Sequence, residues 1–186
     1  IEYYQRFMQS FPTIESLAEA EEDTVLEHWA GLGYYARARN LHKTAKIVAI
    51  ELKGNFPNNL EEIVKLPGIG RSTAGAILSI AFKQSACILD GNVKRVLCRF
   101  HGIENWSGEK KTENQLWELA EQHTPIKRND DYTQAIMDLG ATCCTRSKAK
   151  CEKCPISSKC IAFEKGLQVQ LPKSKPKKAI PQREIW

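Results

Sequence analysis

Apolar residues recur along the chain at helical spacing, in segments that prolines separate. In residues 34–52 they fall three or four positions apart and form one stripe: Tyr34, Ala38, Leu41, Ala45, Val48 and Leu52. Similar spacing returns in residues 70–81, 93–100, 116–120 and 132–139. No stretch alternates with the period of two that a half-buried strand requires. The pattern therefore predicts an all-α fold of about nine or ten short helices.

Aspartates precede several of these segments, at positions where a helix N-cap is expected. They are Asp23, Asp90, and either Asp130 or Asp131. After about Gly166 the helical pattern ends, and PKSKPKKAIPQ is typical of an extended linker.

Composition agrees with a folded chain. Of the 186 residues, 42% are hydrophobic and 26% are charged, which suits one medium domain or two small ones. The mean hydropathy of −0.42 and the lack of a long apolar run exclude a membrane span. No export signal is visible, and because no initiator Met is present, we expect the chain to begin within a larger protein.

Charge is unevenly distributed. The net charge is +5, and residues 165–186 carry six bases against one acid, so the rest of the chain is neutral overall. Within it, residues 1–30 are acidic, whereas 31–53, 84–102 and 141–164 are basic. The basic segments could fold into one face that binds nucleic acid, or they could be solvated surface.

Four of the seven cysteines crowd into one loop, which indicates a metal site in a reducing compartment rather than a disulfide framework. Their spacing is C-x6-C-x2-C-x5-C: Cys144, Cys151, Cys154 and Cys160. Zinc suits four thiolates equally well. A single C-x2-C pair with two lone cysteines nevertheless favours an iron–sulfur cluster over a zinc ribbon. Cys87, Cys98 and Cys143 fall outside this spacing and are expected to be core thiols.

Residues 66–77, LPGIGRSTAGAI, place a glycine-rich turn before a predicted helix. Free N–H groups and the helix dipole make such a terminus an anion site, but a simple packing corner fits the local pattern equally. The string L-P-G-I-G-x-x-T-A resembles a helix–hairpin–helix, which clamps a DNA phosphate.

Residues 29–41, WAGLGYYARARNL, contain a second glycine-rich turn before a predicted helix. The two tyrosines that follow it could stack on DNA bases or form a buried pair.

Asp90 lies between an apolar pair and the predicted helix GNVKRVL. It is expected either to cap that helix or to present an ionised carboxylate to a developing positive charge. The two roles are compatible, because a cap leaves the second oxygen free.

Four segments in this order resemble the helix–hairpin–helix base-excision glycosylases with a 4Fe-4S loop: GLGYYARARNLHK, LPGIGRSTAGAI, ILDGNVKRVL and the cysteine loop. The resemblance is greatest to the MutY-type adenine DNA glycosylases and runs to about residue 165. It implies a six-helix barrel lobe over 1–85 and a second lobe over 86–165, with a DNA cleft between them. Residues 166–186 would be a basic linker toward a C-terminal domain.

The resemblance also implies a function. The expected reaction is hydrolysis of the N-glycosidic bond of adenine opposite 8-oxoguanine or guanine in double-stranded DNA, by a monomer in the bacterial cytoplasm. Asp90 matches the catalytic aspartate, and the four loop cysteines match the ligands of a 4Fe-4S cluster. The expected DNA contacts are Gly68, Gly70, Arg71, Ser72, Thr73, Arg37, Lys94, Arg95 and Tyr34, the last as a wedge in the base stack.

Two parts of the family pattern lie outside this sequence: the general-acid glutamate and the C-terminal domain that recognises oxidised guanine. We therefore expect the chain alone to be inactive. Ser72 stands where relatives with lyase activity carry the imine-forming lysine, which argues against an endonuclease III-like glycosylase. That enzyme and a non-catalytic DNA-binding module remain the alternatives.

Overall fold

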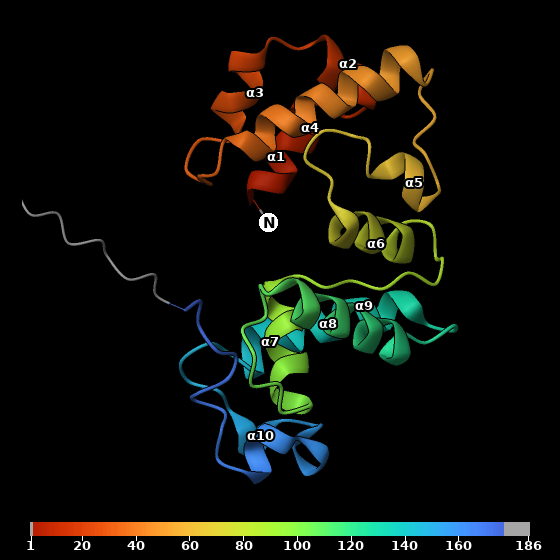
Figure 1. The fold of residues 1–186 in the computed structure, drawn as a ribbon. Helices are drawn as coiled ribbons and strands as arrows, with labels where there is room; N and C mark the ends of the chain where they lie inside the picture. Colours follow the sequence, from red (N-terminus) through yellow and green to blue (C-terminus); the bar gives the residue numbers. More distant parts are fainter. Residues whose placement is uncertain (1, 177–186) are drawn as a thin grey trace, which may run out of the picture. The chain divides into compact units, whose positions relative to one another are not determined.

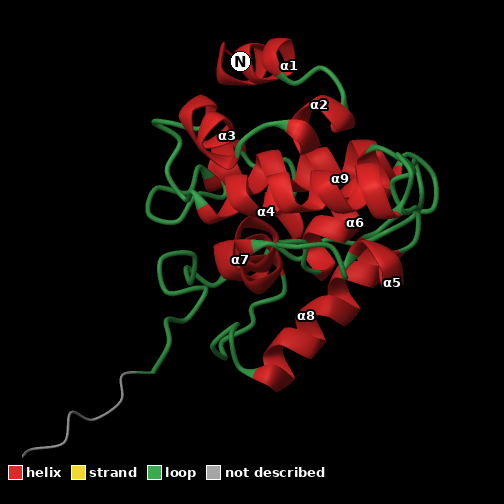
Figure 2. Cartoon of the chain, turned by 90° about the horizontal axis from the view of Figure 1, so that it is seen from above, coloured by secondary structure: helices red, strands yellow, loops and turns green. Residues whose placement is uncertain are grey.

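The computed structural model describes residues 2–176, and this part of the chain consists of ten α-helices joined by turns and loops (Figure 1). Figure 2 shows the same part coloured by secondary structure, with helices and loops and no strand. The all-α expectation is confirmed, and none of these helices combines the length and apolar character needed to span a membrane. The helices are α1 (Glu2–Ser10), α2 (Ile14–Glu19), α3 (Glu22–His28), α4 (Ala36–Lys46), α5 (Leu60–Ile63), α6 (Arg71–Ile80), α7 (Gly91–Phe100), α8 (Lys110–His123), α9 (Asn129–Asp138) and α10 (Ile161–Glu164).

The chain divides into two compact units between Ala74 and Gly75, within α6. In the first unit α4 packs against α2 and α3. Its buried cluster consists of Phe11, Leu17, Ala18, Val25 and Ala45. The helix continues past α4 as one π-helical turn, Ile47–Glu51.

The predicted stripe of residues 34–52 is only partly correct. Ala38, Ala45 and Val48 are fully or almost fully buried, as expected, but Tyr34 and Leu41 are exposed. Tyr34 precedes α4 and has a left-handed backbone, with φ of 50°. The two glycines before it, Gly31 and Gly33, also have positive φ and form a turn that postpones the helix to Ala36.

In the second unit α7 packs against α8, α9 and α10, so most of its length is buried. Val93, Val96 and Leu97 join the main apolar cluster, which confirms the spacing predicted for residues 93–100. The side chain of Cys98 is fully buried in the same cluster. Burial raises the pKa of its thiol to about 11, in agreement with a core cysteine.

One of the predicted aspartate caps is correct. Asp90 Oδ1 accepts a hydrogen bond from the Val93 amide at 2.8 Å and caps α7. Asp23 and Asp130 lie inside the first turns of α3 and α9 instead, because these helices begin one residue before them. There a carboxylate still interacts favourably with the helix dipole, which explains why sequence alone misplaced the two starts.

The packed structure extends beyond residue 165. Leu171 is buried, and its carbonyl oxygen accepts a hydrogen bond from Arg99 Nε at 2.8 Å. Further on, the Lys175 ammonium lies 5.5 Å from the centre of the Trp106 ring. The last bases of the predicted linker, from Lys177 onward, lie outside the described residues.

Candidate functional site

The glycine-rich turn at Leu66–Gly70 is built as a tight corner in the first unit. The Ile69 amide donates to the Leu66 carbonyl, and the Thr44 hydroxyl donates to the Pro67 carbonyl at 3.3 Å. Gly68 has φ of +75°, and a Cβ there would lie 2.7 Å from the Asn40 Cβ. Only glycine adopts this φ without strain and also leaves room for Asn40, so the turn requires glycine at position 68.

Gly70 has a different reason to be glycine. A Cβ at this position would meet no atom within 4 Å, so packing alone would allow a side chain here. Gly70 is exposed and directly precedes α6, whose first turn contains Arg71, Ser72 and Thr73. This ten-residue helix therefore begins beside an exposed backbone position, and a helix N-terminus is a favourable place for a phosphate.

The Tyr34 side chain is 83% exposed on the loop that leads into α4. Its backbone conformation is one that non-glycine residues rarely adopt. The Trp29 indole N–H donates to the Gly33 carbonyl at 3.1 Å and so ties the loop to α3. The structure thus excludes the buried tyrosine pair, because Tyr35 is also exposed.

Asp90 is half-buried at the N-terminus of α7 and directly follows the buried residues Ile88 and Leu89. Its Oδ1 is used by the cap, whereas Oδ2 accepts only a long contact of 3.4 Å from Asn92 Nδ2. One carboxylate oxygen is therefore held in place by the helix and the other is weakly engaged. Such an arrangement keeps the carboxylate oriented and available to a developing cation.

Arg95 connects this helix terminus to the cysteine loop. It donates to Asn92 Oδ1 at 2.8 Å, to the Gly140 carbonyl at 2.7 Å and to the Cys144 carbonyl at 2.7 Å. A continuous path of hydrogen bonds thus leads from the Asp90 carboxylate to the backbone of Cys144. The sequence did not indicate this role, since Arg95 was expected to contact DNA.

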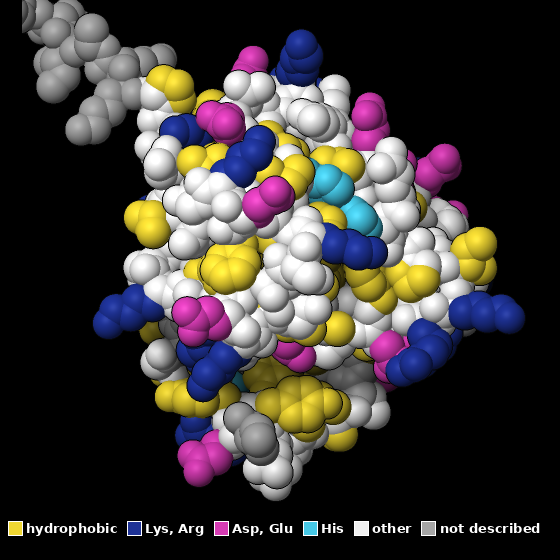
Figure 3. Space-filling model, turned by 90° about the horizontal axis from the view of Figure 1, so that it is seen from below, with side chains coloured by type: hydrophobic (Ala, Val, Ile, Leu, Met, Phe, Trp, Pro, Cys, Tyr) yellow, Lys and Arg dark blue, Asp and Glu magenta, His cyan; other side chains and the backbone are white. Residues whose placement is uncertain are grey.

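The neighbouring base Lys94 is also engaged within the second unit. Its ammonium lies 2.6 Å from Glu113 Oε1, and this bond lowers the pKa of the Glu113 carboxyl. Basic and acidic side chains are likewise interspersed on the face drawn in Figure 3, where Lys and Arg form no continuous patch. Contact of Lys94 and Arg95 with DNA stays a prediction.

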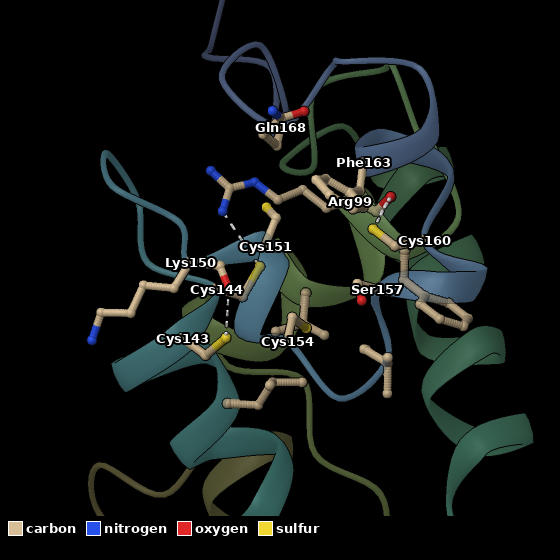
Figure 4. A pocket seen from close by; sticks show the side chains of 14 residues that line it. Arg99, Cys143, Cys144, Lys150, Cys151, Cys154, Ser157, Cys160, Phe163 and Gln168 are labelled. Atoms are coloured by element: carbon tan, nitrogen blue, oxygen red, sulfur yellow. Dashed lines mark hydrogen bonds between the residues drawn. The ribbon is translucent and has the colours of Figure 1, made fainter.

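Figure 4 shows the pocket that the cysteine loop forms with α7. All four cysteines of the C-x6-C-x2-C-x5-C spacing line it: Cys144, Cys151, Cys154 and Cys160. Cys144 directly follows the π-helical turn Leu139–Cys143. The other three lie in or directly after two short 3₁₀ turns, Cys151–Lys153 and Ser157–Lys159. Cys143 lines the same pocket, which its position outside the spacing did not indicate.

Arg99 reaches into this pocket although it is only 3% exposed. Its Nη1 donates to Cys144 Sγ at 3.3 Å and to the Thr145 carbonyl at 2.7 Å, and Nη2 donates to the Arg146 carbonyl at 3.0 Å. Among the described residues Arg99 pairs with no carboxylate, and a buried cation of this kind needs such acceptors, which a thiolate would complete. An arginine within the apolar stripe of α7 was the signal in the sequence for this role.

The pocket suits iron–sulfur ligation chemically. Burial, together with the neighbouring Cys144 and Cys160, raises the pKa of the Cys151 thiol. The Cys151 thiol thus disfavours negative charge until a cation is present, as expected of a ligand beside other metal-binding thiols. Among residues 2–176 no three Cys, His or acidic side chains are grouped closely enough for a single ion. In a cluster each thiolate binds its own iron, so the four sulfurs need not converge on one point.

Comparison with known proteins decides the family. Residues 1–122 match the profile of the HhH-GPD superfamily base excision DNA repair proteins. The chain belongs to this superfamily. The HhH-GPD chain is 46% identical to the adenine DNA glycosylase of Buchnera aphidicola subsp. Schizaphis graminum over 186 residues. It is 46% identical to the human adenine DNA glycosylase over 172 residues, which cover 92% of this chain and 32% of that protein.

Solved structures agree with the fold. A thermostable thymine-DNA glycosylase superposes on the HhH-GPD chain with a TM-score of 0.78 and 30% identity, covering 88% of this chain and 76% of that one. An endonuclease III–DNA complex gives a TM-score of 0.71 at 23% identity, over 90% of this chain and 77% of that one. The chain spans about half the length of the curated bacterial relatives, 54% for the first Buchnera protein.

Proposed function

We propose that this chain is the central part of an adenine DNA glycosylase, which removes adenine paired with 8-oxoguanine or guanine in double-stranded DNA. The observation that carries the proposal is the 46% identity to an adenine DNA glycosylase along all 186 residues. Three features supply what such a reaction needs: the glycine-rich turn at Leu66–Gly70 (the hairpin corner) for a phosphate, the exposed Tyr34 ring for the base stack, and the capped Asp90 carboxylate for the sugar.

In this proposal the target adenosine leaves the base stack before its glycosidic bond breaks. The amides at Gly70–Thr73 grip a phosphate, and the Tyr34 ring enters the disturbed stack. A general acid of the full-length protein, outside these 186 residues, protonates the departing adenine. The sugar gains oxocarbenium character, the Asp90 carboxylate stabilises this charge, and water then adds to the sugar. Ser72 offers no amine, so hydrolysis proceeds without an imine to the sugar.

The proposal includes a 4Fe-4S cluster held by Cys144, Cys151, Cys154 and Cys160. The cluster would supply structural chemistry, because ligation stabilises a polar loop that buries little apolar surface. Arg99 would donate a hydrogen bond to the Cys144 sulfur once it binds iron, and Arg95 would keep the loop joined to the Asp90 terminus. A reducing compartment would keep the four ligand thiols free to bind iron, and all seven cysteines are free in the structure.

Single-turnover excision by the full-length protein tests the proposal, with duplexes that carry A:8-oxoG, A:G or A:T pairs. We expect adenine release from the first two duplexes, and no adduct after borohydride treatment. The chain of 186 residues alone should bind the same duplexes. Release of thymine, or an adduct that borohydride traps through a lysine, would instead identify another glycosylase of the superfamily.

A further inference from the structure

A series of aromatic contacts in the first unit leads from its core to the surface. Phe11 is buried, and its ring centre lies 4.9 Å from that of Phe7. Phe7 meets Trp29 edge to face, with the ring centres 6.2 Å apart. The Arg37 guanidinium continues the series, 5.6 Å from the centre of Trp29 and 5.5 Å from that of Tyr34. The exposed Tyr34 ring is therefore connected to the core through a single arginine.

The backbone of the loop is fixed by the same residues. Trp29 donates to the Gly33 carbonyl, and the Arg37 amide donates to the Tyr34 carbonyl at 2.9 Å. Tyr34 keeps its left-handed backbone at a cost of about 1–2 kcal/mol, which its surroundings must offset. These contacts determine where the Tyr34 Cα lies. The Tyr34 ring itself is 83% exposed, and the Arg37 guanidinium lies over it.

We propose that Arg37 is a positioning residue, whose guanidinium contacts the rings of both Trp29 and Tyr34 and holds the Tyr34 ring in the orientation that enters the DNA base stack. This inference rests on the proposed function. A ring oriented in the free protein loses less conformational entropy when DNA binds than a ring that rotates freely. The guanidinium suits this task because it is planar and stacks on aromatic faces, whereas an ammonium is a point charge.

The proposal differs from a simple phosphate contact, in which only the positive charge of Arg37 would matter. Arg37→Lys keeps the charge and removes the planar face, and Arg37→Gln removes the charge. Arg39→Lys is the matched control, because Arg39 lies on the same helix and its Nε instead pairs with Glu22 at 3.4 Å. Tyr34→Ala reports what the ring itself contributes.

The experiment uses the 186-residue chain and a duplex with 2-aminopurine beside the mispaired adenine. Arg37→Lys should weaken binding about two- to fivefold, the range of an exposed cation–π contact. It should also reduce the change in 2-aminopurine emission on binding, and leave the salt dependence of binding unchanged. In the free protein the Trp29 indole N–H resonance should shift. Arg39→Lys should match the parent chain in all four measurements.

The outcomes distinguish failure of the positioning role of Arg37 from failure of the proposed use of Tyr34. If Tyr34→Ala alters the emission and Arg37→Lys does not, the positioning role is overturned while the proposed use of Tyr34 stands. Parent-like binding by Arg37→Lys, with weaker binding and a smaller salt slope for Arg37→Gln, would likewise reduce Arg37 to a phosphate contact. If Tyr34→Ala leaves the emission unchanged, the use of Tyr34 in the proposed function fails, and the role of Arg37 fails with it.

Discussion

Arg95 donates through Nε to the carbonyl oxygen of Cys144 at 2.7 Å, and so joins α7 to the first cysteine of the metal loop. The same guanidinium binds Asn92, which contacts the Asp90 carboxylate. The site expected to hold the cluster and the site expected to stabilise the sugar cation therefore share one side chain.

Replacing Arg95 should disturb both sites. A lysine ammonium cannot reach the three acceptors that the guanidinium satisfies, so Arg95→Lys should lower the free energy of unfolding by about 1–3 kcal/mol. Urea unfolding followed by circular dichroism measures this change, and iron content should fall with it. Arg71→Lys, at an exposed position, serves as the control and should retain the parent stability.

The cluster assignment makes Cys151 and Cys143 behave differently, although both line the same pocket. Cys151→Ser should lose iron, sulfide and visible absorption, because it removes one of four ligands. Cys143→Ser should keep all three. Stoichiometric zinc without iron in the parent chain would contradict the assignment.

Gly68 and Gly70 should separate folding from binding. Gly68→Ala forces a side chain into a positive φ and toward Asn40, so it should cost about 1–2 kcal/mol of stability or more. Gly70→Ala meets open space and should fold normally, yet bind DNA less tightly because its methyl group lies where a phosphate approaches. Melting temperatures and affinities for one duplex give the two comparisons. Normal binding by Gly70→Ala would remove the hairpin corner from the DNA interface.

Asp90 should tolerate loss of charge in folding but not in catalysis. Asn is itself a good N-cap, so Asp90→Asn should keep the parent stability, whereas Asp90→Ala should lose about 1 kcal/mol. In the full-length protein both variants should excise adenine at least about 100-fold more slowly, since neither stabilises the sugar cation. Near-normal excision by Asp90→Asn would leave Asp90 with the capping role alone.

The second unit should lose stability in mild acid through His101. Its Nε2 lies 2.8 Å from the Nε2 of His123, and burial, with the neighbouring His123, lowers the pKa of His101 below 6.5. Because the unfolded chain binds the proton more readily, stability should decline as the pH falls from 6.5 through the lower folded pKa. Urea titrations between pH 7.5 and pH 5.5 test this. His101→Gln should have a smaller decline, and an unchanged slope would exclude this pair as its cause.

The sequence was sufficient for features that depend on local spacing. Helical periodicity predicted the all-α fold and the buried face of α7, because such a stripe has to face a core. The Asp90 cap and the positive φ of Gly68 also follow from residue type and immediate neighbours. The four spaced cysteines do line one pocket, as a short loop constrains them to do.

Only the tertiary structure decided which distant residues meet. Periodicity placed Tyr34 on the stripe of a helix, but two glycines with positive φ set it on an exposed loop, where Arg37 and Trp29 hold it. The family resemblance led us to expect Arg95 at the DNA and named no role for Arg99. Both guanidiniums turn inward, because the cysteine loop returns against α7 with carbonyl oxygens that need donors. A sequence shows which groups require partners, and the path of the chain in space determines which partners they find.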